Sequence, residues 1–143
     1  MLSLALCSTK VLMVMPEIYI AAAIILDPSG HMLLVRKKNT ARFMQAGGKI
    51  EKDETPLAAL LREMREELQI EPDANQIFYH GQFLAAAANE PNHTVRAHIY
   101  QLTWHNPIHI AAEIEEAIWI TPTSASTLPL APLTEHIIIP LLI

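Results

Sequence analysis

The chain has 143 residues, of which 51% are hydrophobic and 17% charged, a composition that fits a folded globular domain and excludes an intrinsically disordered chain. The formal net charge is −5, from ten Lys and Arg against fifteen Asp and Glu, so we expect no nucleic-acid polymer as a partner. A small phosphate ligand that brings its own cations remains compatible with this charge. Cys7 is the single cysteine, which excludes an intrachain disulfide and favours a reducing compartment; we therefore expect a cytoplasmic protein.

The first fifteen residues, MLSLALCSTKVLMVM, are apolar but lack the basic leading segment of a secretory signal. Polar residues interrupt them before they reach the length that crosses a bilayer, so we expect no membrane partner. We predict that residues 1–15 form an N-terminal extension or an extra strand, and that residues 16–143 form a single domain.

An apolar run over residues 18–26 predicts a buried strand, and Asp27-Pro28-Ser29-Gly30 is a turn signal before a second apolar run over residues 31–36. These features predict a β-hairpin. The polar residues 37–42 then predict a loop, and residues 43–50 a short extended segment that contains the pair Gly47-Gly48.

Thr55-Pro56 marks the start of a helix, with Thr55 as the N-cap and Pro56 at the first helical position, where a missing N–H costs nothing. The helix is expected to end near Leu68. Downstream, the pattern predicts a hairpin of two strands, a short late strand, a surface connection and a closing helix interrupted by Pro140; the respective ranges are 76–88 with 94–104, 117–120, 121–132 and 133–142. Strands on both sides of one strong helix, with a terminal helix, predict an α+β or α/β sandwich with a mixed sheet.

The predicted helix carries an unusual concentration of acid on one flank. At 100° per residue, Glu63, Glu66 and Glu67 fall within an arc of roughly 100°, beside an apolar stripe that faces the core. Like charges at this spacing repel, and oxygen ligands select hard cations such as Mg²⁺. A helix of this kind considered alone is more often a solvated Glu/Arg face than a metal site, so the acidic flank needs support from its surroundings.

That support comes from the preceding segment. Gly48, five further residues, Glu54, seven further residues and then the run REMREELQI ending at Ile70 resemble the signature of the Nudix hydrolases. These enzymes cleave nucleoside diphosphates linked to another group. The chain departs from the signature at Gln69, where the family usually has glycine, and Ala46 stands where many members have proline. Gln69 should either adopt the left-handed conformation at a cost of roughly 1 kcal/mol or change the helix exit.

The resemblance implies a Nudix-type α/β/α sandwich with a mixed β-sheet, with the catalytic helix over about residues 56–68 and a C-terminal helix. It implies hydrolysis of a phosphoanhydride bond in a small nucleotide, including nucleoside triphosphates or oxidised nucleotides, with Mg²⁺ or Mn²⁺ as cofactor. Metal ligands would be Glu63, Glu66, Glu67 and the main-chain oxygen of Gly48. The catalytic set would include Glu66, Glu63 and Arg62, while Glu54 and Gly47 would support the site.

The resemblance leaves the general base open between a helix glutamate and a carboxylate before a late strand, where EIEEAIWI supplies Glu113, Glu115 and Glu116. Of these we favour Glu113 or Glu116, and for each of them a solvated acidic turn is an equally common interpretation. Glu90 lies in the turn between two predicted strands and is expected to be a turn residue, with a contact to the site as the alternative. Arg36 and Phe43 are substrate-binding candidates, as a phosphate contact and a stacking ring, although each is more often a structural residue.

Two alternative functions and one question about association follow from the same sequence. A non-catalytic Nudix-like module for nucleotide sensing or partner binding is one, although such a module gains nothing from a costly acidic cluster. An isomerase, or a diphosphatase of non-nucleotide substrates, is another. Finally, the apolar ends, including HIIIPLLI, predict either a homodimer contact or packing onto the chain's own core.

Overall fold

The computed structural model describes residues 15–143, so the extension or extra strand expected over residues 1–15 lies, apart from Met15, outside the described residues. The described part contains seven strands: β1 (Glu17–Leu26), β2 (Met32–Lys37), β3 (Phe43–Met44), β4 (Ala46–Lys49), β5 (Phe78–Ala86), β6 (Thr94–Thr103) and β7 (Ile114–Ile120). Its helical segments are α2 (Pro56–Leu68), α3 (Pro122–Ala125), α4 (Ile139–Leu142), a 3₁₀ turn η1 (Ala74–Gln76) and a π-helical turn η2 (Thr134–Ile138).

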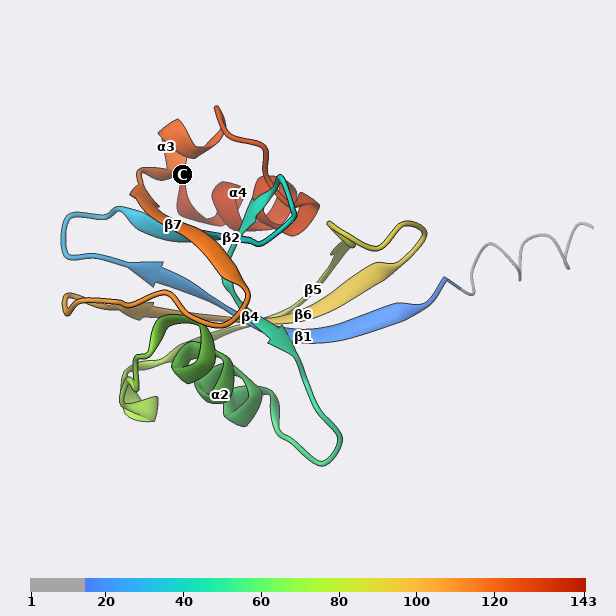
Figure 1. Ribbon diagram of the computed structural model, residues 1–143, viewed down its shortest axis with the longest axis horizontal. Helices are drawn as coiled ribbons and strands as arrows, with labels where there is room; N and C mark the ends of the chain where they lie inside the picture. Colours follow the sequence, from blue (N-terminus) through green and yellow to red (C-terminus); the bar gives the residue numbers. More distant parts are fainter. Residues whose placement is uncertain (1–14) are drawn as a thin grey trace, which may run out of the picture.

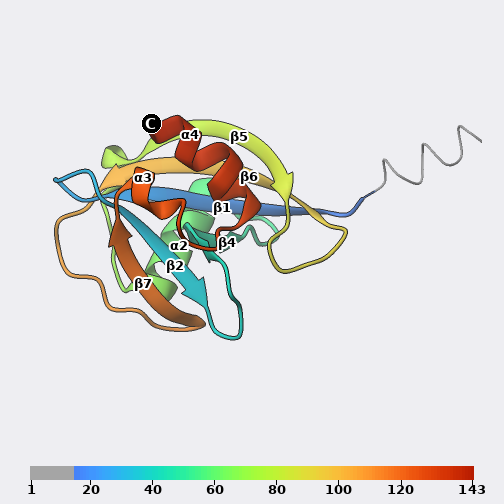
Figure 2. The ribbon, with the colours of Figure 1, turned by 90° about the horizontal axis from the view of Figure 1, so that it is seen from above.

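All seven strands belong to one mixed sheet. Strands β3, β2, β1, β6 and β5 follow one another, with β4 additionally paired to β1 and β7 to β2. The β1–β6 pair is parallel, whereas the other pairs are antiparallel. Figure 2 shows β2 beside β7, and β1, β6 and β5 beside one another.

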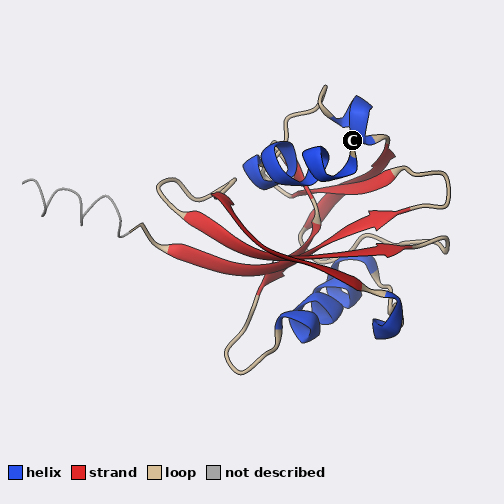
Figure 3. Ribbon diagram, turned by 180° about the vertical axis from the view of Figure 1, so that it is seen from behind, coloured by secondary structure: helices blue, strands red, loops and turns tan. Residues whose placement is uncertain are grey.

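Helices cover both faces of the sheet. Helix α2 lies on one face, and α3, η2 and α4 lie on the other (Figures 1 and 3). Alternate residues of β1 serve the two cores because strand side chains point to opposite faces. Ala21, Ala23 and Ile25 pack on the α2 side, and Ala22 and Ile24 pack on the other. The predicted α/β/α sandwich with a mixed sheet is confirmed.

The first predicted hairpin forms only at its turn. Strands β1 and β2 pair at Leu26 and Met32, after which β2 runs beside β7 and β3, and β1 beside β4 and β6. The sheet therefore opens between β1 and β2, which local sequence could not indicate because these partners are distant in the chain. The second predicted hairpin, β5–β6, is confirmed.

The end of the chain also differs from the prediction. Strand β7 starts at Ile114, three residues before the expected start, so part of the acidic cluster is in a strand. The predicted surface connection over residues 121–132 contains α3 and buries Ala125, Leu130 and Ala131. Its main chain is anchored because Phe43 N–H donates to Pro129 O, a long-range contact invisible in the local sequence.

The closing helix is confirmed over residues 134–142, but it is not uniform. Residues 132–133 are already helical, the π turn η2 follows, and α4 begins next to Pro140. Ile138 and Ile139 are buried against the sheet, while Leu141 and Ile143 stay exposed. Among the described residues, none of the helices has the length and hydropathy needed to cross a membrane.

Candidate active site

The site is built where β4 enters α2. Strand β4 pairs with β1 so that Gly47 lies opposite Ala22 and Gly48 opposite Ala21. Gly47 has φ of +147°, and a Cβ there would overlap the carbonyl oxygen of Ala21, so this position requires glycine. The glycine pair therefore lets the main chain of β4 approach β1 without an intervening side chain.

Helix α2 starts and ends as the sequence indicates. The Thr55 side chain accepts a hydrogen bond from Ala58 N–H at 3.1 Å, and Pro56 occupies the first turn. At the other end Gln69 is left-handed, with φ of 57° and ψ of 42°, and its N–H donates to Arg65 O. Of the two outcomes expected for Gln69, the structure shows the strained conformation. The Gln69 side chain also donates to His109 O at 3.2 Å.

Arg62 is the centre of the charged network on α2. Its Nε donates to Glu54 Oε2 at 2.7 Å and its Nη2 to Glu54 Oε1 at 2.9 Å, a bidentate pair that few other side chains can make. Its Nη1 reaches Glu63 at 2.8 Å and Glu66 at 3.2 Å, and Nη2 also donates to Lys49 O at 3.0 Å. One guanidinium thus fixes three carboxylates and the strand that precedes the helix.

The pKa values follow from these contacts. Hydrogen bonds from Arg62, and then from the Glu51 N–H, lower the pKa of Glu54 to about 2. The same pairing, led by Glu54, raises the pKa of Arg62 above its already high ordinary value. Both groups are therefore charged under all ordinary conditions, as a permanent brace must be.

Glu67 is in a very different environment. It is only 1% exposed, and its Oε1 accepts a hydrogen bond from Gly47 N–H at 3.0 Å. Burial raises its pKa to about 8; the charges of Glu63 and Glu113 add to the rise, whereas the Gly47 N–H and Lys37 oppose it. Its Oε2 is buried with no hydrogen-bond partner. An unpaired buried oxygen of this kind is costly and calls for a proton or a cation.

Glu63 lies against the second glycine. A Cβ on Gly48 would come within 2.6 Å of the Glu63 carboxyl carbon, so any larger residue at this position would displace the carboxylate from where it lies. Glu63 is mostly buried and Glu66 is half-exposed, and both are held by Arg62. The acidic flank predicted from the sequence therefore lies directly beside the glycine pair.

Within residues 15–143, no three acidic, histidine or cysteine side chains converge closely enough to form a ready-made metal site. The reason is visible in the contacts, because Arg62 draws Glu63 and Glu66 to itself while Glu67 turns to Gly47. The residues nevertheless fit a hard divalent cation. Glu67 Oε2 lacks a partner, Gly48 leaves space at Glu63, and every donor is oxygen.

The two late carboxylates separate in the structure. Glu113 pairs with Lys37 at 3.2 Å, and its charge acts on Glu67, so it lies near helix α2. Glu116 is opposite Arg36 in the β2–β7 ladder and pairs with it at 3.1 Å. The preceding same-facing pair, Leu34 and Ile118, packs in the core on the α4 side, so the Arg36–Glu116 pair faces away from α2.

The two substrate-binding candidates also have other roles. The Arg36 guanidinium is occupied by Glu116 and by Thr40 O at 2.7 Å. Phe43 is 7% exposed and packs in the core on the α4 side, which leaves no ring face for a base. Phe43 is thus a core residue, because β3 is held between β2 on one side and residues 129–131 on the other.

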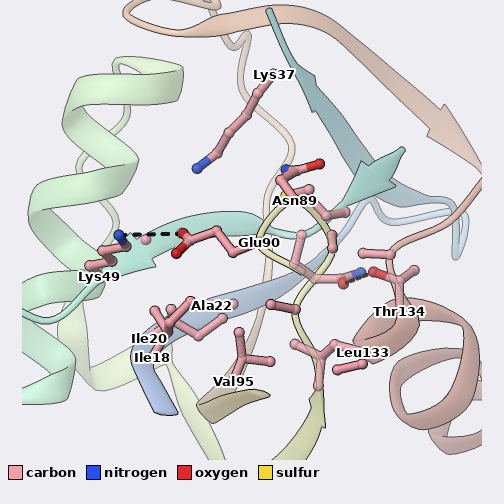
Figure 4. A pocket seen from close by; sticks show the side chains of 18 residues that line it. Ile18, Ile20, Ala22, Lys37, Lys49, Asn89, Glu90, Val95, Leu133 and Thr134 are labelled. Atoms are coloured by element: carbon pink, nitrogen blue, oxygen red, sulfur yellow. Dashed lines mark hydrogen bonds and ion pairs between the residues drawn. The ribbon is translucent and has the colours of Figure 1, made fainter. Parts of the chain in front are cut away.

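A cleft opens beside Gly47 and Gly48, as Figure 4 shows. Its floor is aliphatic, with Ile18, Ile20, Ala22, Val95 and Leu133, and the β5–β6 loop forms one wall. Lys49 and Glu90 stand on one side, paired at 3.5 Å, and Glu90 is a residue of the β5–β6 loop that lines the cleft.

Sequence reasoning did not propose as site residues five polar residues that line the cleft: Lys37, Gln45, Lys49, Asn89 and Thr134. In the sequence, only their polar residue type could have indicated a place in the cleft. Gln45 and Thr134, for example, are joined by a hydrogen bond but lie 89 positions apart in the chain.

Comparisons with known proteins agree with this geometry. A family model described as the NUDIX domain matches residues 17–141. The chain is 35% identical over 126 residues to a CTP pyrophosphohydrolase of Escherichia coli K12, covering 82% of this chain and 86% of that protein.

Two solved structures show the same fold. A solution structure of the E. coli ORF135 protein is 30% identical, with a TM-score of 0.62, over 90% of this chain and 87% of that chain. The crystal structure of a MutT protein from Methanosarcina mazei Go1 is 20% identical, with a TM-score of 0.70, over 89% of this chain and 93% of that chain. Proteins of the matched family generally use divalent metal ions. With the signature from Gly48 to Ile70, the sandwich fold and the family match in agreement, this chain belongs to the Nudix hydrolase family.

Proposed function

We propose that this protein hydrolyses a phosphoanhydride bond of a nucleoside triphosphate, or of another nucleoside diphosphate linked to a further group, with Mg²⁺ as cofactor. The observation that carries the proposal is the Arg62 brace, which fixes Glu54, Glu63 and Glu66 beside Gly48 at the mouth of the cleft. A purely structural ion-pair network would not need a buried, unpartnered carboxylate oxygen next to it.

Each residue has a specific task in this proposal. Glu63, Glu66, Glu67 and the main-chain oxygen of Gly48 would hold Mg²⁺, with Mn²⁺ as a substitute. When bound, the ion supplies Lewis-acid activation of water and neutralises phosphate charge. Arg62 and Glu54 keep the carboxylates oriented, which avoids reorganisation during the reaction. Lys37 and Lys49 line the cleft and supply positive charge for the phosphate chain.

Proton removal from the attacking water falls to a carboxylate near Glu67. Glu113 meets this condition, because it lies close enough for its charge to act on Glu67. Glu66, half-exposed on the helix, is the second candidate. Glu116 is engaged by Arg36 on the opposite face, so we assign it a structural role.

The relative in E. coli is named a CTP pyrophosphohydrolase, and this places a cytidine nucleotide first among the substrates to test. The floor of the cleft is apolar, as a nucleobase site usually is. We accordingly propose a small nucleotide as the partner. The exposed Leu141 and Ile143 support a homodimer contact as a further proposal, which light scattering would test.

The test measures release of pyrophosphate and monophosphate from nucleoside triphosphates, oxidised nucleotides, dinucleoside polyphosphates and nucleotide sugars, with Mg²⁺ and with Mn²⁺. Glu66→Gln removes one proposed ligand, and Glu71→Gln is the matched control because Glu71 is exposed just beyond the helix. We expect metal-dependent turnover in the wild type and in Glu71→Gln, and a loss of at least tenfold in Glu66→Gln. Binding without turnover of any compound would instead support a nucleotide-sensing module.

A further inference from the structure

The proposed mechanism gives no role to Gln69, the residue at the end of α2 that departs from the family signature. Gln69 stands where the signature usually has glycine, and its φ of 57° is left-handed. This conformation is unfavourable for a residue with a Cβ and easy for glycine. Glycine would end the helix with less strain, so the presence of glutamine calls for a contact that its side chain makes.

That contact joins Gln69 to the β6–β7 segment, residues 104–113, which connects the two strands. The Gln69 Nε2 donates to His109 O at 3.2 Å. A main-chain carbonyl only accepts hydrogen bonds, so the nitrogen of the carboxamide is the end that faces His109. The contact therefore needs a donor at position 69, which glycine does not have.

Two main-chain hydrogen bonds dock the same segment on the end of α2. His109 N–H donates to Leu68 O at 3.0 Å, and Ala111 N–H donates to Glu67 O at 2.9 Å. Both acceptors are among the last four carbonyls of the helix, which have no partner within the helix itself. With the bond from Gln69, both main-chain polar groups of His109 are tied to the helix end.

The docked segment leads directly to Glu113, the carboxylate proposed to take the proton from water. Ala112, just before it, is a second left-handed residue with a Cβ, at φ of 54°. Ile114 N–H donates to Ala111 O at 3.2 Å, which closes a tight turn over Ala112 and Glu113. Such conformations persist where the surrounding contacts hold them, and they are common at functional sites. Glu113 thus follows within two residues of Ala111, whose N–H is bonded to the main chain of Glu67.

We propose that Gln69 is a positioning residue, which holds the β6–β7 segment on the end of α2 and thereby keeps Glu113 beside the proposed metal ligand Glu67. This inference rests on the proposed function and adds a residue to it. The proton of the attacking water passes to the Glu113 carboxylate, the water oxygen bonds to phosphorus, and the P–O bond to the leaving phosphate breaks with its electron pair. Gln69 touches none of these atoms. Its loss should lower kcat and leave KM unchanged, because a small misplacement of a reacting group slows the chemical step.

The first experiment measures kcat and KM, for the nucleotide that is hydrolysed fastest, in the wild type, Gln69→Gly, Gln69→Glu and Gln69→Lys. Glycine relieves the strain but has no donor, glutamate keeps the length but offers the carbonyl no donor, and lysine restores one. We expect kcat to fall about fivefold or more in Gln69→Gly and Gln69→Glu, with KM within about twofold of the wild type. Gln69→Lys should keep kcat within about twofold, as should the surface control Glu71→Gln. A purely structural role predicts instead that kcat follows thermal stability, which Gln69→Gly should not lower.

A second arm follows hydrogen exchange at the His109 and Ala111 amides by NMR in metal-free protein, so it needs no turnover. Both amides should exchange about fivefold faster or more in Gln69→Gly and Gln69→Glu than in the wild type, with the amides of β1 as the reference for global unfolding. If the wild type hydrolyses nothing, the proposed function fails, and the exchange rates alone decide whether Gln69 holds the segment. Unchanged exchange in Gln69→Gly overturns the proposal. Faster exchange with unchanged kcat overturns it as well, and so does a kcat in Gln69→Lys as low as that in Gln69→Gly.

Discussion

The environment of Glu67 predicts that the metal-free protein loses stability as the pH rises. Its pKa is raised by burial from 4.5 to about 8. Between these values the native state keeps a proton on Glu67 that the unfolded chain has released. The stabilising effect is therefore complete below pH 4.5 and is lost progressively as the pH rises towards 8.

The size of this stability change follows from the one proton that the native state binds and the unfolded chain does not. A difference of one bound proton changes the free energy of unfolding by about 1.4 kcal/mol per pH unit. Between pH values of about 5 and 8, Glu67 should thus cost the metal-free protein about 3 to 4 kcal/mol. This is a large share of the roughly 5 to 15 kcal/mol that stabilise a typical domain.

The assay is denaturant unfolding across this pH range in a chelating buffer, with Glu67→Gln as the comparison. Glutamine can still accept the Gly47 N–H bond but does not ionise, so the difference between the two proteins isolates this one group. We expect the free energy of unfolding of Glu67→Gln to rise relative to that of the wild type by about 1.4 kcal/mol for each pH unit. Added Mg²⁺ should restore the stability of the wild type at the alkaline end of the range. Parallel pH profiles for the two proteins would refute the reasoning, because they would mean that Glu67 is already ionised at neutral pH.

Four further substitutions test the rest of the site. Gly48→Ala places a methyl group against the Glu63 carboxylate, and kcat should fall at least tenfold with little change in the far-ultraviolet circular dichroism spectrum. Arg62→Lys cannot make the bidentate pair, so unfolding free energy should drop by about 1–3 kcal/mol, and an unchanged denaturation midpoint would contradict the brace. Glu54→Gln should remove part of the acid unfolding that occurs as the pH falls from 4.5 to about 2, since ionised Glu54 stabilises only the folded state. Gln69→Gly relieves a left-handed residue and should raise stability by about 0.5–1 kcal/mol in thermal unfolding, less what the lost bond to His109 O contributes.

The local parts of the site were readable before the fold was known. The N-cap Thr55, the proline after it and the acidic flank of α2 all depend on helix geometry, which repeats every 3.6 residues whatever surrounds it. For Gln69 the sequence left two outcomes open, a left-handed residue or a changed helix exit, and the structure shows the left-handed one.

Long-range pairing decided what the local pattern could not. Phe43 has an aromatic side chain that could stack on a base, yet the bridge from β3 to residues 129–131 places it in the core. Glu113 and Glu116 are three positions apart in one acidic run, and the β2–β7 register sends Glu116 to Arg36 on the face away from α2 while Glu113 stays near Glu67.

The sequence by itself determined the catalytic helix, its caps and the carboxylates on its flank, since these follow from residue type and spacing along one element. The tertiary structure alone decided which carboxylate is buried, which late glutamate approaches the helix, and that Gln45 meets Thr134. Burial and hydrogen bonding between distant segments arise only when sheet register and layer packing bring those segments together, and neither is encoded within a local window of the chain.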